Sequence, residues 1–332
     1  MFVDLIKKVL RPFRRLLNHT FRVEWRRIRR YFIWDATIFV HSRKADMETV
    51  LAPIIVDYHV IEKGLTMPDR RLGFGQETVK RLIGRIDHFE QIFGSENGQW
   101  RHAVGVVRAY VELHKAEGYH FEDGVFSALL ERFNLRYDNL LVCRQAHISK
   151  KNFYSFCKSS FDEFARSRHT VRHYLNVPID NGRIKAAVEL AMTAPSACNR
   201  QHARVRCVTD KSLMKKILGI QGGSRGFGHF ADKLLVVSAD LRDCLGAYER
   251  NDGYINGGIF LMNLCHALHF HGIAHCILSC SLELDKVECL RTVLDMPGNE
   301  VLVAMVLCGE APDEFDVATS PRREVNEVLQ FV

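Results

Sequence analysis

Residues 194–205 read APSACNRQHARV, and this segment joins an alanine-rich stretch to a β-branched one. Helical spacing runs over Ile184–Met192, Pro195 ends that helix, and a strand begins near Ala203. The loop between them is rich in hydrogen-bonding side chains, namely Ser196, Asn199 and Gln201. Such a loop can present backbone and amide groups to a flat polar heterocycle. It can equally be the end of a helix, with its polar side chains satisfied within the turn.

The segment FARSRHTVRHY, residues 164–174, carries three polar side chains at two-residue spacing: Arg168, Thr170 and Arg172. In an extended segment this spacing puts all three on one face. Two guanidinium forks with a hydroxyl between them suit a phosphate group. Exposed arginines are also common near a helix start, so a solvated surface remains the alternative for this segment taken alone.

Two further segments contain arginines that could contribute to an anion site. The segment GGSRGFG, residues 222–228, is not the dinucleotide fingerprint G-x-G-x-x-G, because it precedes a strand. We expect a close-approach loop there, with Arg225 within reach of an anionic ligand. The segment TSPRREV, residues 319–325, contains Arg322 and Arg323, which either add to an anion site or form a solvated run of charge.

From about Ser160 onward, helices alternate with short β-branched runs. Strands are expected over Arg204–Val208, Leu234–Ser238, His275–Leu278 and Val301–Cys308, and helices over Asn181–Thr193, Ser212–Leu218 and Gly257–Gly272. This alternation predicts an α+β domain in which helices cover a mixed sheet.

The helix expected over Gly258–His271 is apolar nearly all round, which predicts full burial and suggests a subunit interface. Four histidines near its end resemble a metal cluster: His266, His269, His271 and His275. Gly272 interrupts the helix between them and no carboxylate joins them, so we assign no metal site.

Residues 45–155 are expected to be mostly helical, with helices over Gln76–Phe93 and Gly98–Glu117. The segment YHVIEKGLTMPDRRLGFG, residues 58–75, gathers charges of both signs around glycines and a proline. It is either a charged lip or partner-binding loop, or a helix capped at Gly64 and followed by a salt-bridged loop.

The formal net charge of the 332-residue chain is +7, and the charge is concentrated at one end. Residues 1–30 carry +8 and the remainder −1, which argues against a nucleic-acid-binding body. Residues 1–44 form a basic arm with the spacing of an amphipathic helix, divided by Pro12. Such an arm either lies on an anionic membrane surface or packs on the protein's own body.

The chain has no run of 18 or more apolar residues, and its start does not resemble a signal peptide. Its ten cysteines show no paired metal-ligand spacing. We therefore expect a cytoplasmic protein. Whether its arm also contacts the inner face of the membrane stays open.

These segments together resemble a known family. Their order is similar to the start of nitroreductase-family domains. The motif Arg-x-Thr-x-Arg lies over Arg168–Arg172 and is followed by a helix. The motif A-P-S-x-x-N-x-Q then lies over Ala194–Gln201 and opens a strand. The later apolar helix and the arginines that follow the strand ending at Gly309 keep the family's order. The resemblance covers about 170 residues, which we take as a domain over 156–332.

The resemblance implies an α+β homodimer that binds FMN at the dimer interface. Its implied cofactor contacts are Arg168, His169, Thr170, Arg172, Pro195, Ser196, Asn199, Gln201, Ser224, Arg225, Ile277, Leu278, Ser279, Arg322 and Arg323. The arginines near 170 and one of the last two would hold the phosphate and ribityl chain. The loop after Ala194 and the backbone of residues 277–279 would line the flavin ring, and either Ser224 or Arg225 would add a polar contact.

The implied chemistry belongs to the flavin, which takes hydride from NAD(P)H and passes electrons to a small organic acceptor. No protein acid or base is required, so we assign no catalytic residue. Two alternatives stay open: a flavin-dependent dehydrogenase or oxidase of a biosynthetic intermediate, and a degenerate flavin fold that serves as a scaffold. Three departures from the family bear on substrate choice: His202 replaces the usual proline, residues 277–280 lack glycines, and the helical region has no counterpart in short members.

Overall fold

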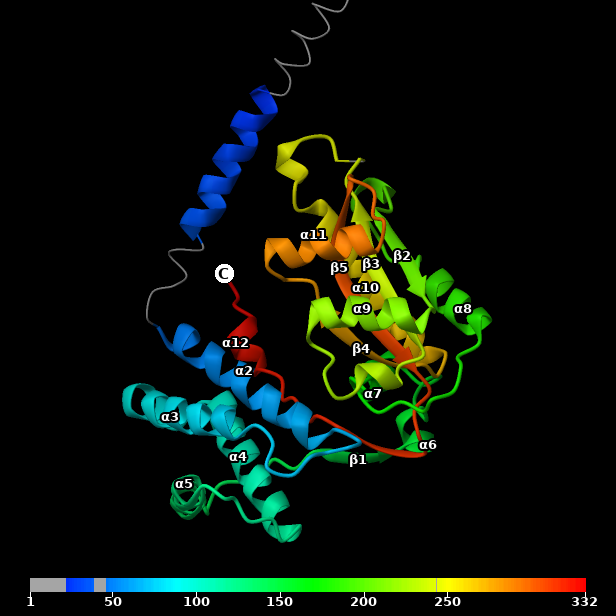
Figure 1. The fold of residues 1–332 in the computed structure, drawn as a ribbon. Coiled ribbons are helices and arrows are strands. Elements are labelled where there is room, and N and C mark those ends of the chain that lie inside the picture. Colours follow the sequence, from blue (N-terminus) through cyan, green and yellow to red (C-terminus); the bar gives the residue numbers. More distant parts are fainter. Residues whose placement is uncertain (1–21, 39–45, 243) are drawn as a thin grey trace, which may run out of the picture.

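The computed structural model describes residues 22–38, 46–242 and 244–332. Most of the basic arm, including Pro12, lies outside the described residues. The described part of the arm is a helix over residues 22–38, shown in dark blue in Figure 1, which extends away from the rest of the chain. It is tied to the body by an ion pair between Asp35 and Arg250 at 2.8 Å, and the Arg250 guanidinium also lies 4.3 Å from the Tyr31 ring centre.

The helical region predicted for the N-terminal half is confirmed. It contains α2 (Met47–Leu65), α3 (Gln76–Phe93), α4 (Gly98–Ala116) and α5 (Gly124–Arg136). Side chains of Asp46, Asn97 and Asp123 accept hydrogen bonds from the first turns of α2, α4 and α5, as N-caps do. The four helices enclose a core of their own, whose largest fully buried side chains are Trp100, Tyr110, Phe89 and Phe126.

A buried ion pair links two of these helices. The Glu62 carboxylate on α2 has no exposed surface and lies 2.8 Å from Nε2 of His102 on α4. Burial raises the pKa of Glu62, but hydrogen bonds from His102 and His59 outweigh it and bring that pKa down to about 2. Burial lowers the pKa of His102, but hydrogen bonds with Cys143 and Glu62 raise it to about 9. Both groups are therefore charged near neutral pH.

The C-terminal half is built on a four-stranded sheet with the strand order β2-β3-β5-β4. The strands are β2 (Ala203–Val208), β3 (Lys233–Asp240), β4 (Ala274–Ser279) and β5 (Glu300–Gly309), close to the predicted runs. The predicted α+β class is confirmed. All three strand pairs are antiparallel, which is more uniform than the mixed sheet expected from the sequence.

Helices cover both faces of this sheet (Figure 1). One face packs against α8 (Asn181–Ala191) and α10 (Asp252–Phe270), and the other against α9 (Lys211–Gln221) and α11 (Leu284–Val293). The central strand β3 is buried along its whole length, and its successive residues point into opposite cores. Leu234 and Val236 join the core under α9, whereas Leu235 and Val237 join the core under α10.

The full burial predicted for the Gly258–His271 helix is wrong for the single chain. One face of α10 packs tightly on the sheet, where a Cβ atom on Gly257 would lie 2.6 Å from the Val303 side chain. The opposite face is open to solvent. There Ile255, Ile259 and Met262 are 57%, 41% and 42% exposed. Apolar side chains alone do not reveal which face of a helix its own chain covers.

Short elements join the two halves, and the sequence did not predict them. Strand β1 (Ala146–Ser149) pairs antiparallel with β6 (Glu314–Val317), next to α6 (Lys150–Phe153). The tail after β6, which contains α12 (Val325–Val328), then crosses to the helical half. Its anchor is Ser320, whose backbone N–H and hydroxyl both donate to Glu62 at 3.4 Å. Glu62 thus holds α4 and the C-terminal tail against α2.

No helix among the residues that the structure describes is long and apolar enough to cross a membrane. The remaining helical elements are α7 (Phe161–Ser167) and the short 3-10 turns Ala197–Asn199, Gly228–Phe230 and Ala247–Glu249.

Glu62→Gln should lower the free energy of unfolding of the helical half by about 3–5 kcal/mol near pH 6, because it leaves His102 buried without its counter-charge. The lowered pKa of Glu62 makes its contribution present above pH 4.5 and lost towards pH 2. The raised pKa of His102 makes its contribution complete below pH 6.5 and lost as the pH rises through 9. Wild-type stability should therefore fall between pH 6.5 and 9, and Glu62→Gln should flatten that fall.

The measurement is urea unfolding followed by Trp100 fluorescence, with Trp25 and Trp34 replaced by Phe. Glu77→Gln is the matched control, because Glu77 forms an exposed ion pair with Lys80. An effect of Glu62→Gln no larger than that of Glu77→Gln would contradict the structural role of the buried pair.

Candidate functional site

The Arg168–Arg172 segment runs along the open edge of the sheet. Strand β4 is an edge strand, and the backbone N–H of Val171 donates to the carbonyl of His275 on it at 3.0 Å. The Tyr174 side chain is buried and its hydroxyl donates back to Val171 at 2.6 Å, which fixes the segment in an extended form. Arg168 has extended backbone angles and residues 168–174 form no helix, which is the condition under which the two-residue spacing places the three side chains on one face.

Arg172 is the most deeply buried cation of this segment. Its side chain is only 6% exposed, its Nε has no hydrogen-bond partner, and its guanidinium hydrogen-bonds with the Cys276 sulfur. Arginine is rarely buried unless it is paired, and no described carboxylate pairs with this one. An orphaned buried guanidinium N–H is what an anion or a carbonyl oxygen of a ligand would satisfy.

Arg168 lies among neutral and cationic groups. Burial lowers its pKa, and the nearby Arg322 lowers it further. Burial and the charges of Arg168 and Arg322 also lower the pKa of His169. Because mutual repulsion and desolvation both disfavour this arrangement, the cluster of Arg168, His169 and Arg322 is suited to bind an anion. Thr170 lies between Arg168 and Arg172 in the same segment and, like Arg168, is half-buried.

The two C-terminal arginines differ in what they contact. Arg323 forms an ion pair with Glu48 of α2 at 2.6 Å and a longer one with Glu327. Arg322 donates to the carbonyl of Ser320 and lies in the electrostatic neighbourhood of Arg168. The charge of Arg323 is thus neutralised within the chain, whereas Arg322 joins the cationic cluster.

The loop after Ala194 is held in a strained form. Three residues of this loop other than glycine, Cys198, Asn199 and Gln201, have positive φ angles of 51°, 54° and 53°. Each such residue costs on the order of 1 kcal/mol, and such strain is concentrated at functional sites. The loop is fixed by Ser196, whose hydroxyl accepts from the backbone of Gln201, and by Asn256, whose side chain accepts from the backbone of Ala197.

A hollow of about 500 Å³ opens beside this loop. Pro195, Ser196 and Gln201 line it, together with Asn256 of α10. His202 is also among its lining residues, is completely buried, and has no hydrogen-bond partner at either ring nitrogen. Pro195, Ser196 and Gln201 therefore border a cavity, whereas Asn199 is exposed and is not among its lining residues.

The remaining predicted contacts are placed as follows. Ser224 is buried, and Arg225 is exposed with its Nε donating to the carbonyl of Gly222. Ile277 is 40% exposed on β4, Leu278 is buried in the core, and the carbonyl of Ser279 accepts from the Gln221 side chain at 3.0 Å. The Gly222–Gly228 loop is thereby tied to the end of β4.

The predicted cofactor contacts form two groups that are separated within a single chain. The loop with Ser196 is held at Asn256 near the start of α10, whereas Phe164 and Arg168 lie near His266 towards its end. Ten residues of α-helix span about 15 Å, so the two groups lie along different parts of the helix. The open apolar face of α10 runs between them.

Three of the four histidines, His266, His269 and His275, influence one another electrostatically. His269 hydrogen-bonds with the Ser167 hydroxyl, and burial with the nearby His275 and Arg168 lowers its pKa to about 3. Burial also lowers the pKa of His275 to about 4. Within the described ranges, no three His, Cys, Asp or Glu side chains are arranged to hold a metal ion.

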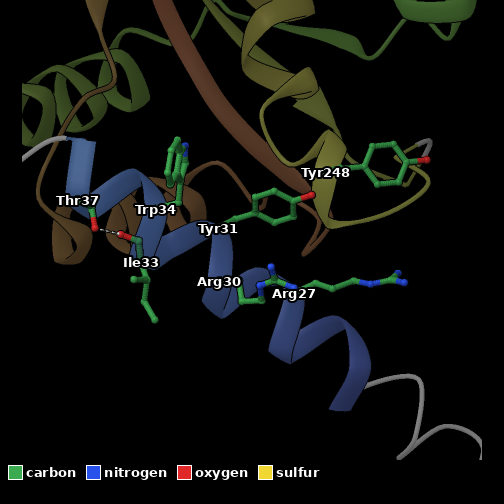
Figure 2. A pocket seen from close by; sticks show the side chains of 7 residues that line it. All are labelled: Arg27, Arg30, Tyr31, Ile33, Trp34, Thr37 and Tyr248. Atoms are coloured by element: carbon green, nitrogen blue, oxygen red, sulfur yellow. Dashed lines mark hydrogen bonds between the residues drawn. The ribbon is translucent and has the colours of Figure 1, made fainter.

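A second, wider hollow of about 890 Å³ lies outside this region. Figure 2 shows it between the helix over residues 22–38 and Tyr248, lined by Arg27, Arg30, Tyr31, Ile33, Trp34, Thr37 and Tyr248. None of the predicted cofactor contacts borders it. This hollow forms where the helix over residues 22–38 contacts the C-terminal half.

Sequence reasoning placed Lys63 of α2 in the charged segment of residues 58–75 but did not predict what it contacts. Its Nζ donates to the carbonyl of Gly223 at 3.4 Å, which brings the helical half into contact with the Gly222–Gly228 loop. No local signal marks this residue, because the contact joins positions 160 residues apart.

Comparison with known proteins converges on one family. The sequence model of the Nitroreductase family matches residues 165–224, which include Arg168, Arg172, Ser196 and Ser224. A putative NADH dehydrogenase/NAD(P)H nitroreductase of Archaeoglobus fulgidus is 28% identical over 153 residues, covering 45% of this chain and 84% of the relative.

Solved structures with a similar C-terminal half include two oxidoreductases. One is a putative NADH dehydrogenase/NAD(P)H nitroreductase from Parabacteroides distasonis, 18% identical, covering 49% of this chain and 92% of its own, with a TM-score of 0.44. The other is the NADPH:FMN oxidoreductase of Vibrio harveyi complexed with NAD+, 17% identical, covering 51% of this chain and 76% of its own, with a TM-score of 0.45.

Proposed function

Because the C-terminal half of this chain is a nitroreductase-family domain, we propose that the protein is an FMN-dependent oxidoreductase that uses NAD(P)H and a small organic acceptor. The observation that carries the proposal is that Arg172 is buried and Arg168 half-buried with no described carboxylate partner, inside the segment that the family model matches. Bound FMN would supply the chemistry, by accepting and releasing hydride or electrons.

The residues present fit such a cofactor. Arg168, Arg322 and the Thr170 hydroxyl would hold its phosphate, since guanidinium forks match phosphate oxygens. Arg172, with its unsatisfied Nε, would donate to an oxygen of the cofactor further along. The strained loop with Pro195, and Ser196 within it, would line the ring and exclude water, without any side chain acting as a general acid or base.

We further propose that the site is completed in a homodimer. The open face of α10, with Ile255, Ile259 and Met262, is an apolar stripe of helical spacing between the two separated groups of contacts. A second copy seated on this face would bring its own loop near Ser196 towards the Arg168 cluster. The cofactor contacts would then come from both chains.

The described part of the arm supports peripheral membrane contact. Its helix exposes Trp25, Phe32 and Trp34 by 59%, 71% and 63%, alongside exposed arginines such as Arg26 and Arg29. Aromatic rings beside arginines suit the headgroup region of an anionic bilayer. We propose this as an attachment that leaves the cofactor site free, since the arm leans on Tyr248 and Arg250 and borders none of the proposed cofactor contacts (Figure 2).

Arg322→Ala should weaken FMN binding roughly 10- to 100-fold, because one charge-assisted hydrogen bond to phosphate is worth about 1.5–3 kcal/mol. Its neighbour Arg323→Ala is the matched control and should leave FMN affinity within about twofold. The measurement is titration of apoprotein with FMN, followed by quenching of the flavin's fluorescence. Equal losses in both variants, or a larger loss in Arg323→Ala, would contradict the assignment.

Ile259→Asp should convert a dimer to a monomer and reduce FMN retention with it, because a carboxylate would be desolvated in the α10 contact. Light scattering coupled to size exclusion gives the mass. Leu135→Asp places the same charge at an exposed apolar site of α5 and should stay dimeric. A wild-type monomer that binds FMN fully would rule out the shared site.

Replacing Trp25, Phe32 and Trp34 together by Ser should abolish cosedimentation with phosphatidylserine-containing vesicles, and high salt should weaken the wild-type binding. Neutral phosphatidylcholine vesicles serve as the lipid control. Equal sedimentation of the wild type and the triple variant would exclude this helix as the attachment.

A further inference from the structure

Lys63 brings the helical half into the neighbourhood of the proposed flavin site. It lies in the last turn of α2, and its Nζ donates to the carbonyl of Gly223 at 3.4 Å. The contact is reinforced by Met67, whose sulfur would lie 3.5 Å from a Cβ atom on Gly226. Figure 1 shows α2 running from the helical bundle towards β1, at the side of the C-terminal half where α7 lies.

The surroundings of Lys63 are cationic. Burial lowers its pKa, the neighbouring Arg172 lowers it further, and Arg225 adds to this effect. The Cys276 thiol is the group that acts in the opposite direction. Glu62, its acidic neighbour in the chain, is engaged by His102 and Ser320 instead.

Three cations from three separate segments thus act on one another electrostatically, and no described carboxylate forms an ion pair with any of them. Lys63 comes from α2, Arg172 from the segment along β4, and Arg225 from the Gly222–Gly228 loop. The unsatisfied Nε of the buried Arg172 is the group assigned above to an oxygen of the cofactor, so Lys63 and Arg225 are the cations that the cofactor leaves without a counter-charge. The charge of a half-buried lysine that makes one long hydrogen bond to a carbonyl stabilises the fold little, and the like charges around it destabilise the fold.

The cofactor's phosphate does not account for these charges. Under the proposed function the phosphate is held by Arg168, Thr170 and Arg322, which form a separate cluster around the histidines of α10. Lys63 and Arg225 are additional to that cluster, and Lys63 belongs to a helix outside the matched family segment. The positive charges of Lys63 and Arg225 are therefore suited to bind a second anion besides the cofactor's phosphate.

We propose that Lys63 and Arg225, beside Arg172, form the binding site for an anionic substrate, so that the organic acceptor carries a carboxylate or a similarly charged group. This inference rests on the proposed function for the position of the flavin. It assigns a role to the Tyr58–Gly75 segment: the helical half supplies a substrate-selecting cation to an oxidoreductase domain.

The test uses the full chain loaded with FMN and two small aromatic probes of the same shape, benzoate and its neutral counterpart benzamide. Binding is measured from the change each probe produces in the flavin absorbance, which needs no turnover. Wild type should bind benzoate at least tenfold more tightly than benzamide. Lys63→Gln should weaken benzoate binding about tenfold, equivalent to loss of one charge-assisted contact, and leave benzamide unchanged.

Two variants control for charge and fold. Lys63→Arg should retain most of the benzoate affinity. Lys185→Gln removes a lysine charge from the exposed surface of α8 and should behave as wild type. Equal benzoate binding by wild type and Lys63→Gln would overturn the inference, and so would loss of FMN from Lys63→Gln, which would make Lys63 a cofactor contact. Failure of the wild type itself to take up FMN would instead contradict the proposed function.

Discussion

In the C-terminal half the guanidinium of Arg172 is buried and that of Arg168 is half-buried, and no described carboxylate neutralises either of them. Removing a charge from water without a partner is among the costliest arrangements in a folded protein, so it persists where a ligand supplies the opposite charge. The surrounding structure maintains this arrangement. Strand β4 gives the segment a backbone partner at His275, the buried Tyr174 keeps it extended, and the neighbouring histidines are held neutral by burial.

The helical half matters to the same site through the C-terminal tail. Glu62 is paired with His102 and also accepts hydrogen bonds from Ser320, two residues before Arg322. Arg323 binds Glu48 on the same helix, which leaves Arg322 to face the Arg168 cluster. The position of the arginine that we propose as a phosphate contact thus depends on a buried ion pair in the other half of the chain. The same helix α2 carries Lys63, which contacts the carbonyl of Gly223.

Much of this could be predicted from the sequence, because the signals are local. Period-two and period-3.6 patterns located the four sheet strands and the main helices, and the spacing of Arg168, Thr170 and Arg172 indicated an extended anion-binding segment. What could not be predicted depends on contacts between distant residues. The exposed face of α10, the pairing of β1 with β6, the choice between Arg322 and Arg323, and the position of Lys63 all follow from packing between the halves. No local periodicity encodes such contacts.

The most direct measurement is the visible spectrum of the purified full-length protein, recorded anaerobically after reconstitution with FMN and again after addition of NADH or NADPH. The account predicts uptake of about one FMN per chain, loss of the oxidised-flavin absorbance on adding the nicotinamide, and its return when an organic acceptor or oxygen is admitted. A protein that stays colourless after reconstitution would contradict the account, and so would bound flavin that neither nicotinamide bleaches.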